Sequence, residues 1–129
     1  MFKRFLDWIQ AKIIIENKNR ASQIKEMEIY WCALGENVGD EENGKGDDFC
    51  RPVLIFKKFN NNIFLGIPMS TKNKDNMYYI RVVIQDSIQS AMISQIRILD
   101  TKRLLKKIGY ISREDFERVQ DSVIKLIRR

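Results

Sequence analysis

Apolar side chains recur at helical spacing along the first part of the chain. Phe2, Phe5, Leu6, Ile9 and Ile13 are three or four positions apart, and charged residues lie between them. This period predicts an amphipathic helix over residues 2–24, with a polar hinge or frayed end after residue 17. We expect its apolar face to pack on the same domain or on a partner subunit, and docking on a membrane surface is the alternative.

After residue 28 the pattern changes to short runs of aromatic and β-branched residues separated by polar loops. Such runs predict β-strands, here at residues 28–34, 53–59, 63–69, 78–85 and 91–99, with a short one at 107–111. The three asparagines at 60–62 predict a hairpin turn. Because Pro52 cannot donate a ladder hydrogen bond, it is expected at the start of its strand.

The end of the chain carries helix signals. Residues 100–107 contain a basic turn of helix, and Ser112 with Asp115 resembles a capping box. The helix that follows is expected to bury Phe116, Val119, Val123 and Ile127. This order of elements predicts an α+β fold, mainly β, in which the strands form a small antiparallel, partly closed barrel rather than a parallel sheet.

Length and composition place the chain among ordinary globular proteins. It has 129 residues, of which 44% are hydrophobic, enough for one domain with a core. It has no run of about eighteen apolar residues and no clean signal peptide, so we expect a cytoplasmic protein. Two cysteines without any histidine make no zinc site, and Cys32 and Cys50 are expected to be buried thiols.

Charge is unevenly distributed. Residues 36–48 carry six acids and one lysine, residues 51–74 carry five bases and no acid, and residues 97–129 carry ten bases against five acids. With a net charge of +6, the basic segments indicate either a polyanionic partner or simply a soluble basic surface.

The acidic segment lies in a long glycine-rich loop at residues 35–49. Gly39 to Lys45 matches the first seven positions of a phosphate-binding P-loop, but Gly46 replaces the required Ser or Thr, and the acids at 40–42 would repel a nucleotide. The spacing of the acids does not reproduce a calcium-binding EF-hand either. We expect a mobile, solvated loop.

Two strand ends carry candidate chemistry. Arg51 precedes the strand at 53–59, and Ser70 with Thr71 follows the strand at 63–69. Each has a structural interpretation, as a surface ion-pair partner or as turn residues. Taken together, these residues also have a functional interpretation, because a guanidinium and hydroxyls can hold a phosphodiester and stabilise the negative charge that grows on it.

Several blocks, taken in order, resemble the MazF/PemK family of toxin endoribonucleases. The resemblance covers residues 28 to about 127 and rests on an opening strand, a Gly-rich loop, an Arg-Pro pair, a segment like Pro-Leu-Thr-Ser, a block like Gln-Ile-Arg-Thr-Ile-Asp, and the ending. These blocks are 28–35, Gly39 and Glu41 with the glycines near 44–46, 51–54, 67–72, 94–100, and 102–104 with 107–109 and the capped helix.

The resemblance implies a fold and an activity. The fold is an SH3-like barrel of the plasmid-maintenance toxin type at residues 28–129, with residues 1–27 as an added helix. The activity is cleavage of single-stranded RNA by a homodimer, without metal or cofactor, under control of a cognate antitoxin protein. Arg51 and Ser70 are the implied catalytic residues. The remaining site predictions are Thr71, Ser94 and Gln95 as supporting residues, and Lys57, Lys72, Lys74 and Arg97 as RNA-binding residues.

This chain departs from the family at three positions. The family usually has threonine where Ser70 stands, so the hydroxyl is kept there. Some members have an acid where Ser94 stands and an arginine where Met92 stands. Arginine is also a poor base at neutral pH, so no proton acceptor is evident near Arg51. The alternative to a nuclease is therefore a non-nuclease protein of the toxin fold. It would act by protein contact, as a fold relative that poisons gyrase does, or would only bind its antitoxin or nucleic acid.

Overall fold

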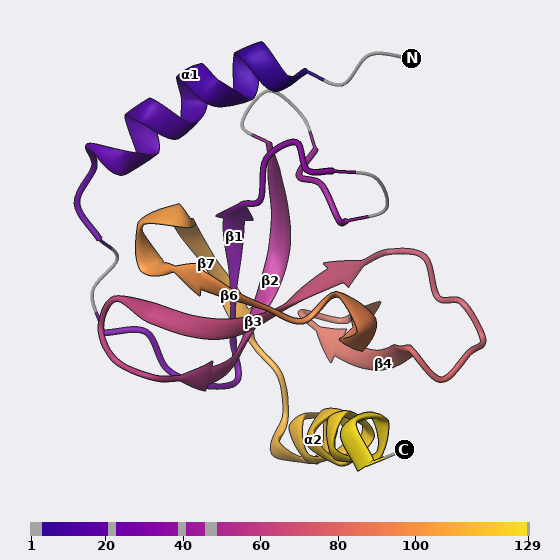
Figure 1. The fold of residues 1–129 in the computed structure, drawn as a ribbon. Helices are drawn as coiled ribbons and strands as arrows, with labels where there is room; N and C mark the ends of the chain where they lie inside the picture. The colour runs from indigo at the N-terminus through magenta and orange to yellow at the C-terminus, as the bar shows by residue number, and fades with distance from the viewer. Residues whose placement is uncertain (1–3, 21–22, 39–40, 46–48, 129) are drawn as a thin grey trace.

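The structure, a computed structural model, describes residues 4–20, 23–38, 41–45 and 49–128. An N-terminal helix, α1 (Phe5–Glu16), precedes the strands, and a C-terminal helix, α2 (Arg113–Arg128), follows them (Figure 1). Two 3-10 turns flank β6, at Ile93–Gln95 and Thr101–Arg103. The strands are β1 (Glu28–Ala33), β2 (Cys50–Lys58), β3 (Ile63–Ser70), β4 (Tyr79–Ile84), β5 (Ser87–Met92), β6 (Arg97–Asp100) and β7 (Leu104–Tyr110).

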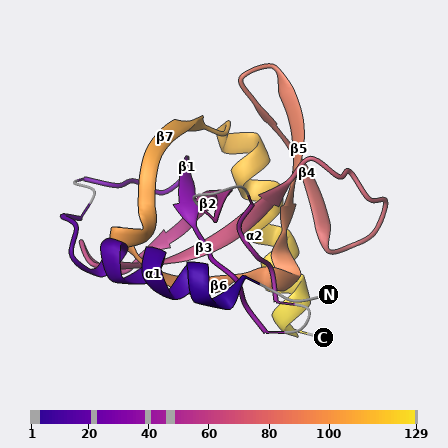
Figure 2. The ribbon, with the colours of Figure 1, turned by 90° about the horizontal axis from the view of Figure 1, so that it is seen from above.

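The seven strands form one antiparallel sheet, in which six follow the order β4-β5-β3-β2-β1-β7 and β6 pairs with β3 off this path. Strand β3 is central, because its first half pairs with β6 and its end pairs with β5 while β2 runs along its other side. The sheet curls, and α1 and α2 lie at different sides of it (Figure 2). The predicted fold class is confirmed, with the sheet left open between β4 and β7.

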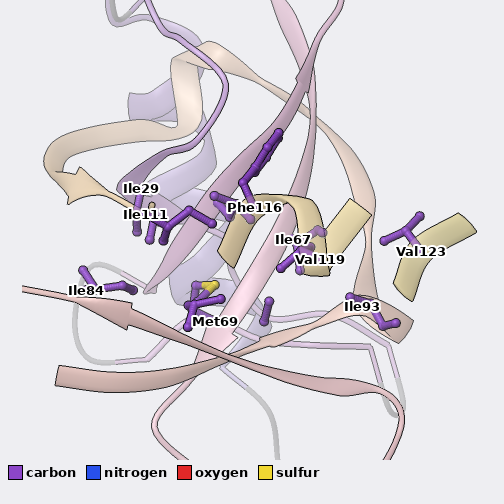
Figure 3. Packing of buried hydrophobic residues seen from close by; sticks show 12 residues of the cluster. Ile29, Ile67, Met69, Ile84, Ile93, Ile111, Phe116, Val119 and Val123 are labelled. Atoms are coloured by element: carbon purple, nitrogen blue, oxygen red, sulfur yellow. The ribbon is translucent and has the colours of Figure 1, made fainter. Parts of the chain in front are cut away.

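Helix α2 closes the larger of the two main apolar clusters. Phe116, Val119 and Val123 pack onto residues of the sheet such as Ile67 and Met69 (Figure 3). Three residues of the predicted face are thus confirmed as buried. Ile127 is not, since 76% of it is exposed. It continues the same stripe, so the last turn of α2 extends beyond the residues that cover that stripe.

Helix α1 is shorter than predicted, and the face that it buries is not the predicted one. Leu6, Ile9 and Ile13 are 79%, 53% and 58% exposed, whereas Trp8 is 5% exposed and packs on the domain. The helix is apolar on nearly every side, so its periodicity did not determine which side would be buried. The buried side is the one that carries the bulky indole of Trp8. Phe2 lies outside the described residues.

Other predicted boundaries were also wrong. The predicted strand at 91–99 is split between β5 and β6 by the 3-10 turn at Ile93–Gln95. Strand β5 begins earlier because Gln85 and Asp86, both with positive φ (46° and 65°), form a tight hairpin turn after β4. The predicted basic turn of helix within residues 100–107 is confirmed as the 3-10 turn Thr101–Arg103, but the chain is strand from Leu104 on, because β7 pairs with β1 there. Pro52 is the third residue of β2, which starts at Cys50.

The two cysteines behave as expected. Cys32 and Cys50 are buried and are not joined in a disulfide. Complete burial raises the pKa of the Cys32 thiol to about 12, because the thiolate would be cut off from water. Cys32 is therefore an unreactive core residue.

No helix among the described residues has both the length and the apolar character needed to cross a bilayer.

Helix α2 also covers the edge of the sheet. The backbone N–H of Val83 in β4 donates to Asp115 Oδ2 at 2.9 Å, and Arg118 donates to the carbonyl of Arg81 and to Asp115. Ser112 caps the helix as predicted, since its hydroxyl accepts from the N–H of Asp115 at 3.1 Å. The carboxylate does not complete the predicted capping box because it is turned to β4. These contacts occupy backbone groups of a strand edge that would otherwise be open to another chain.

We predict that the Asp115 contacts stabilise the fold in a pH-dependent way. Burial alone raises the pKa of Asp115, but the bonds from Arg118 and Val83 outweigh it and lower the pKa below its usual value. A depressed folded-state pKa contributes stability above the unfolded pKa of about 3.9 and loses it as pH falls through the folded value. Asp115→Asn should therefore cost about 1 kcal/mol at pH 7, and progressively less below about pH 4.

Urea unfolding of both proteins between pH 7 and pH 3 measures this difference. The matched control is Glu117→Gln, an exposed acid on the same helix, which should change little. A cost of Asp115→Asn that stays constant down to pH 3 would contradict the assignment.

Candidate active site

Arg51 and Ser70 meet across two neighbouring strands. Strands β2 and β3 pair in a register that sets Val53 opposite Pro68. Extending this antiparallel register by two residues brings Arg51 opposite Ser70. Both residues are buried, with 8% and 7% of their surface exposed. The sheet itself thus brings together the two predicted catalytic residues, which are 19 positions apart in the chain.

The guanidinium of Arg51 is held by backbone carbonyls. Its Nη1 donates to the carbonyl of Met69 at 3.0 Å, and its Nε donates to the carbonyl of Asn43 at 3.1 Å. These bonds fix the plane of the fork, which matters for any ligand that is held by two parallel hydrogen bonds.

A carboxylate completes the environment of this cation. Arg51 Nη2 lies 2.5 Å from Glu42 Oε1, which supplies the counter-charge that a buried guanidinium requires. The backbone N–H of Glu42 donates to the side-chain Oε1 of Gln95 at 3.2 Å. Gln95, predicted as a supporting residue, therefore supports the segment that carries Glu42.

The loop around Glu42 is braced by its own hydrogen bonds. Asn37 Nδ2 donates to the carbonyls of Leu34 and Glu42, at 3.0 and 2.7 Å, and the N–H of Asn37 donates to Asn43 Oδ1 at 2.6 Å. The expectation of a mobile, solvated loop is wrong for this part. Gly39, Asp40 and residues 46–48 lie outside the described residues.

Arg51, Ser70 and Glu42 line one cleft of about 480 Å³. The hydroxyl oxygen of Ser70 accepts from the N–H of Lys72 at 3.1 Å, which leaves its hydrogen to donate to a ligand. Three acids and four bases line the cleft together with polar and apolar residues. The full lining is Glu36, Glu41, Glu42, Asn43, Gly44, Lys45, Arg51, Ser70, Lys72, Lys74, Tyr79 and Met92.

A second, more apolar groove of about 730 Å³ adjoins the cleft. Arg51, Lys45 and Met69 contribute to its wall, and the first two also line the cleft. Thr71 lies here and not in the cleft. The most exposed aromatic residue of the groove is Trp31, with 42% of its surface accessible. The other residues of the groove are Cys50, Pro52, Gln89, Leu105, Lys106 and Ile108.

The structure separates several predicted residues from the cleft. Lys57 is near the opposite end of β2, with its ammonium 4.0 Å from Glu26. Ser94 is exposed on the 3-10 turn, and Arg97 starts β6 opposite Gly66. None of these three predicted residues is among the cleft's lining residues. Lys72 and Lys74 do line it, and the Lys74 ammonium lies 5.3 Å from the centre of the Tyr79 ring.

Sequence reasoning missed Glu42. It treated the acids of the loop as part of a solvated segment, because Glu42 and Arg51 lie nine positions apart in the chain. The available signal was a glutamate two positions before Gly44 in a loop that leads into an arginine. Among the described residues, no three His, Cys, Asp or Glu side chains gather as a metal site.

Comparisons with known proteins concern the family and the fold. Residues 25–127 match the family described as PemK-like, MazF-like toxin of type II toxin–antitoxin system. A search of curated proteins found no significant match. Among solved structures, the crystal structure of MazF (Form-I) from Deinococcus radiodurans is similar, with a TM-score of 0.68 and 13% identity. That match covers 84% of this chain and 100% of the Deinococcus chain.

We predict that Gly44→Ala disturbs the site. A Cβ at Gly44 would lie 1.5 Å from the carbonyl oxygen of Phe49, so the loop must shift and carry Asn43 and Glu42 away from Arg51. Amide hydrogen exchange of Lys45 and Cys50, whose N–H and C=O groups bond each other, should speed up by about tenfold or more.

Gly109→Ala is the matched control. Its Cβ would meet nothing closer than a Gln85 side-chain atom at 3.7 Å, which is an ordinary contact. Equal exchange rates in the Gly44 variant and the parent protein would contradict the proposed bracing.

Proposed function

Since the chain belongs to the family of PemK-like, MazF-like toxins of type II toxin–antitoxin systems, we propose that it is an endoribonuclease that cleaves single-stranded RNA without a metal ion. The supporting observation is the convergence of Arg51, Ser70 and Glu42 on one cleft. These side chains offer a fixed cation, a hydroxyl and a carboxylate, and the reaction needs one of each.

The proposed reaction is an internal transesterification. The ribose 2′-oxygen attacks the adjacent phosphorus and loses its proton to Glu42, and the bond from phosphorus to the 5′-oxygen breaks. The 5′-oxygen takes up a proton from Glu42 or from solvent. The products are a 2′,3′-cyclic phosphate and a 5′-hydroxyl end.

Arg51 stabilises the charge that builds up on the non-bridging oxygens. Its carbonyl anchors and Glu42 account for three of the five N–H groups of a guanidinium, at Nε, Nη1 and Nη2. The phosphate then either takes the remaining donors or replaces Glu42 at Nη2. Replacement would free the carboxylate for the 2′-hydroxyl at the moment when the substrate arrives. Burial strengthens this electrostatic contribution.

Ser70 donates its hydroxyl hydrogen to a non-bridging oxygen in this scheme. Met92, where some relatives have arginine, lines the same cleft and is 3% exposed. The site therefore relies on Arg51 and on lysines for positive charge. Ser94, exposed and outside the cleft lining, is at most a neighbour of Gln95.

RNA is proposed to enter along Lys72 and Lys74. Both are exposed at the rim of the cleft, and Tyr79 beside them offers a face on which a base stacks. Lys57 and Arg97 are proposed only as peripheral contacts with the RNA backbone, because they lie outside the cleft lining.

The partners proposed are a second copy of the chain and a cognate antitoxin, in the cytoplasm. The apolar groove with Trp31 and Leu105 is a suitable surface for an antitoxin segment, since such partners lay an apolar face into a groove. Because Arg51 lines both spaces, a partner in the groove would compete with RNA for the same guanidinium.

We predict cleavage of a defined single-stranded RNA in EDTA, with a cyclic phosphate on the product. Arg51→Ala should lower kcat by about a hundredfold or more, as does the loss of a transition-state donor in other enzymes. Glu42→Gln should also lower kcat strongly, by removing the proton acceptor. Ser70→Thr should retain more activity than Ser70→Ala, because it keeps the hydroxyl.

The control is Arg113→Ala, an exposed arginine at the start of α2, which should cleave like the parent. An Arg51→Ala protein that cleaves at the parental rate would refute the scheme. A parent protein that binds RNA but leaves it intact would instead support the protein-binding alternative.

A second prediction concerns RNA affinity. The variant with both Lys72→Ala and Lys74→Ala should bind an uncleavable RNA more weakly. The slope of the logarithm of its binding constant against the logarithm of the salt concentration should become shallower by about 1.4, which is about 0.7 for each lost phosphate contact. Lys57→Ala should have the smaller effect on both quantities. Fluorescence anisotropy over a range of salt concentrations measures them, and a larger effect from Lys57→Ala would overturn the proposed path.

A further inference from the structure

We propose that helix α1 positions the catalytic arginine. In this proposal Trp8 clamps Phe49, two residues before Arg51, and so sets the direction in which the guanidinium enters the cleft. The inference rests on the proposed function and extends it to a segment that precedes the family match at residues 25–127.

The contact between α1 and the loop is closely fitted. Trp8 is 5% exposed, and its ring lies 5.4 Å from that of Phe49, centre to centre. The Arg4 guanidinium lies 4.3 Å from the centre of the same phenylalanine ring. On the other side, a Cβ at Gly35 would lie 2.0 Å from the indole, so only glycine leaves room for Trp8. Figure 1 shows α1 on the side of the domain where β2 begins.

Phe49 has an unusual backbone that requires such support. Its φ is +55°, a left-handed conformation that bulky residues rarely adopt and that persists only where the surroundings enforce it. Its carbonyl accepts from the N–H groups of Leu34 and Gly35, at 3.0 and 3.1 Å. The backbone bonds hold one side of the residue, and Trp8 holds the side chain.

The support extends directly to the active site. Cys50 follows Phe49, belongs to the same apolar cluster as Trp8, and exchanges two hydrogen bonds with Lys45. Arg51 comes next and bonds the carbonyl of Asn43. If Phe49 relaxed toward an ordinary extended conformation, both ends of this short segment would move, and with them the guanidinium.

The helix contributes to this one region rather than to the main core. Of its residues only Trp8 is buried, and the cluster to which Trp8 belongs is separate from the two clusters that fill the sheet. The segment is tied down by Lys18, whose ammonium donates to the carbonyl of Leu104 at 2.6 Å, and by Lys102, which donates to the carbonyl of Glu16 at 2.9 Å. Loss of Trp8 should therefore disturb the region around Phe49 and leave the two main apolar clusters in place.

The test separates positioning from folding. Trp8→Ala should lower kcat on single-stranded RNA by about ten- to a hundredfold, as expected when a reacting group is misplaced by a fraction of an ångström to 1 Å. KM should change less than about threefold, since Lys72 and Lys74 lie on a different loop. Trp8→Phe should restore most of kcat. Ile14→Ala on the same helix, where 70% of the residue is exposed, should match the parent.

Stoichiometric titration with an RNA carrying a 2′-deoxyribose at the scissile position counts the molecules able to bind. Parental stoichiometry with reduced kcat supports the clamp. If fewer molecules bind, and their loss accounts for the whole loss of kcat, then Trp8 only stabilises the fold. That result would overturn the clamp. Trp8→Leu, a milder change, takes the place of Trp8→Ala if the latter does not fold.

Failure of the clamp is distinguishable from failure of the proposed function. If the parent cleaves RNA and Trp8→Ala cleaves it equally fast, only the clamp is refuted. If the parent does not cleave RNA at all, the nuclease proposal fails. The positional claim is then decided by hydrogen exchange at Lys45 and Cys50, which should speed up in Trp8→Ala and be unchanged in Ile14→Ala.

Discussion

The buried guanidinium of Arg51 is the constraint on which the rest of the site depends. With 8% of its surface exposed, an unpaired cation there would cost several kcal/mol. Its partners come from two segments outside β2, namely the carbonyl of Met69 on β3 and the carbonyl of Asn43 with the carboxylate of Glu42 in the acidic loop. Satisfying one charge thus ties the loop to the sheet.

The same pairing connects stability with chemistry. Glu42 neutralises Arg51 in the structure, yet a bound phosphate would compete for the same Nη2. In the proposed reaction, a substrate that displaces Glu42 would bring this carboxylate to the 2′-hydroxyl, so one ion pair would both hold Arg51 and provide the proton acceptor. Gln95 limits how far the loop moves, because it accepts a bond from the backbone of Glu42.

The N-terminal helix adds a second constraint on this loop. The domain already possesses two apolar clusters without α1, so the helix is not needed to fill the sheet. Its one buried residue, Trp8, packs where Phe49 holds a left-handed backbone. The outward residues Leu6 and Ile13 are exposed. A helix that is apolar on both sides is consistent with packing through one side and presenting the other.

Much of the fold and part of the site followed from sequence alone. Alternating and β-branched runs predicted most strands, the spacing of Phe116, Val119 and Val123 predicted the buried face of α2, and the order of the blocks predicted the family and the pair of Arg51 with Ser70. Local chemistry sufficed because periodicity and turn residues are properties of neighbouring positions.

Tertiary structure alone decided which side of α1 is buried and that Glu42 is the partner of Arg51. Both depend on contacts between segments far apart in the chain, where burial of an indole and neutralisation of a buried charge outweigh any local pattern.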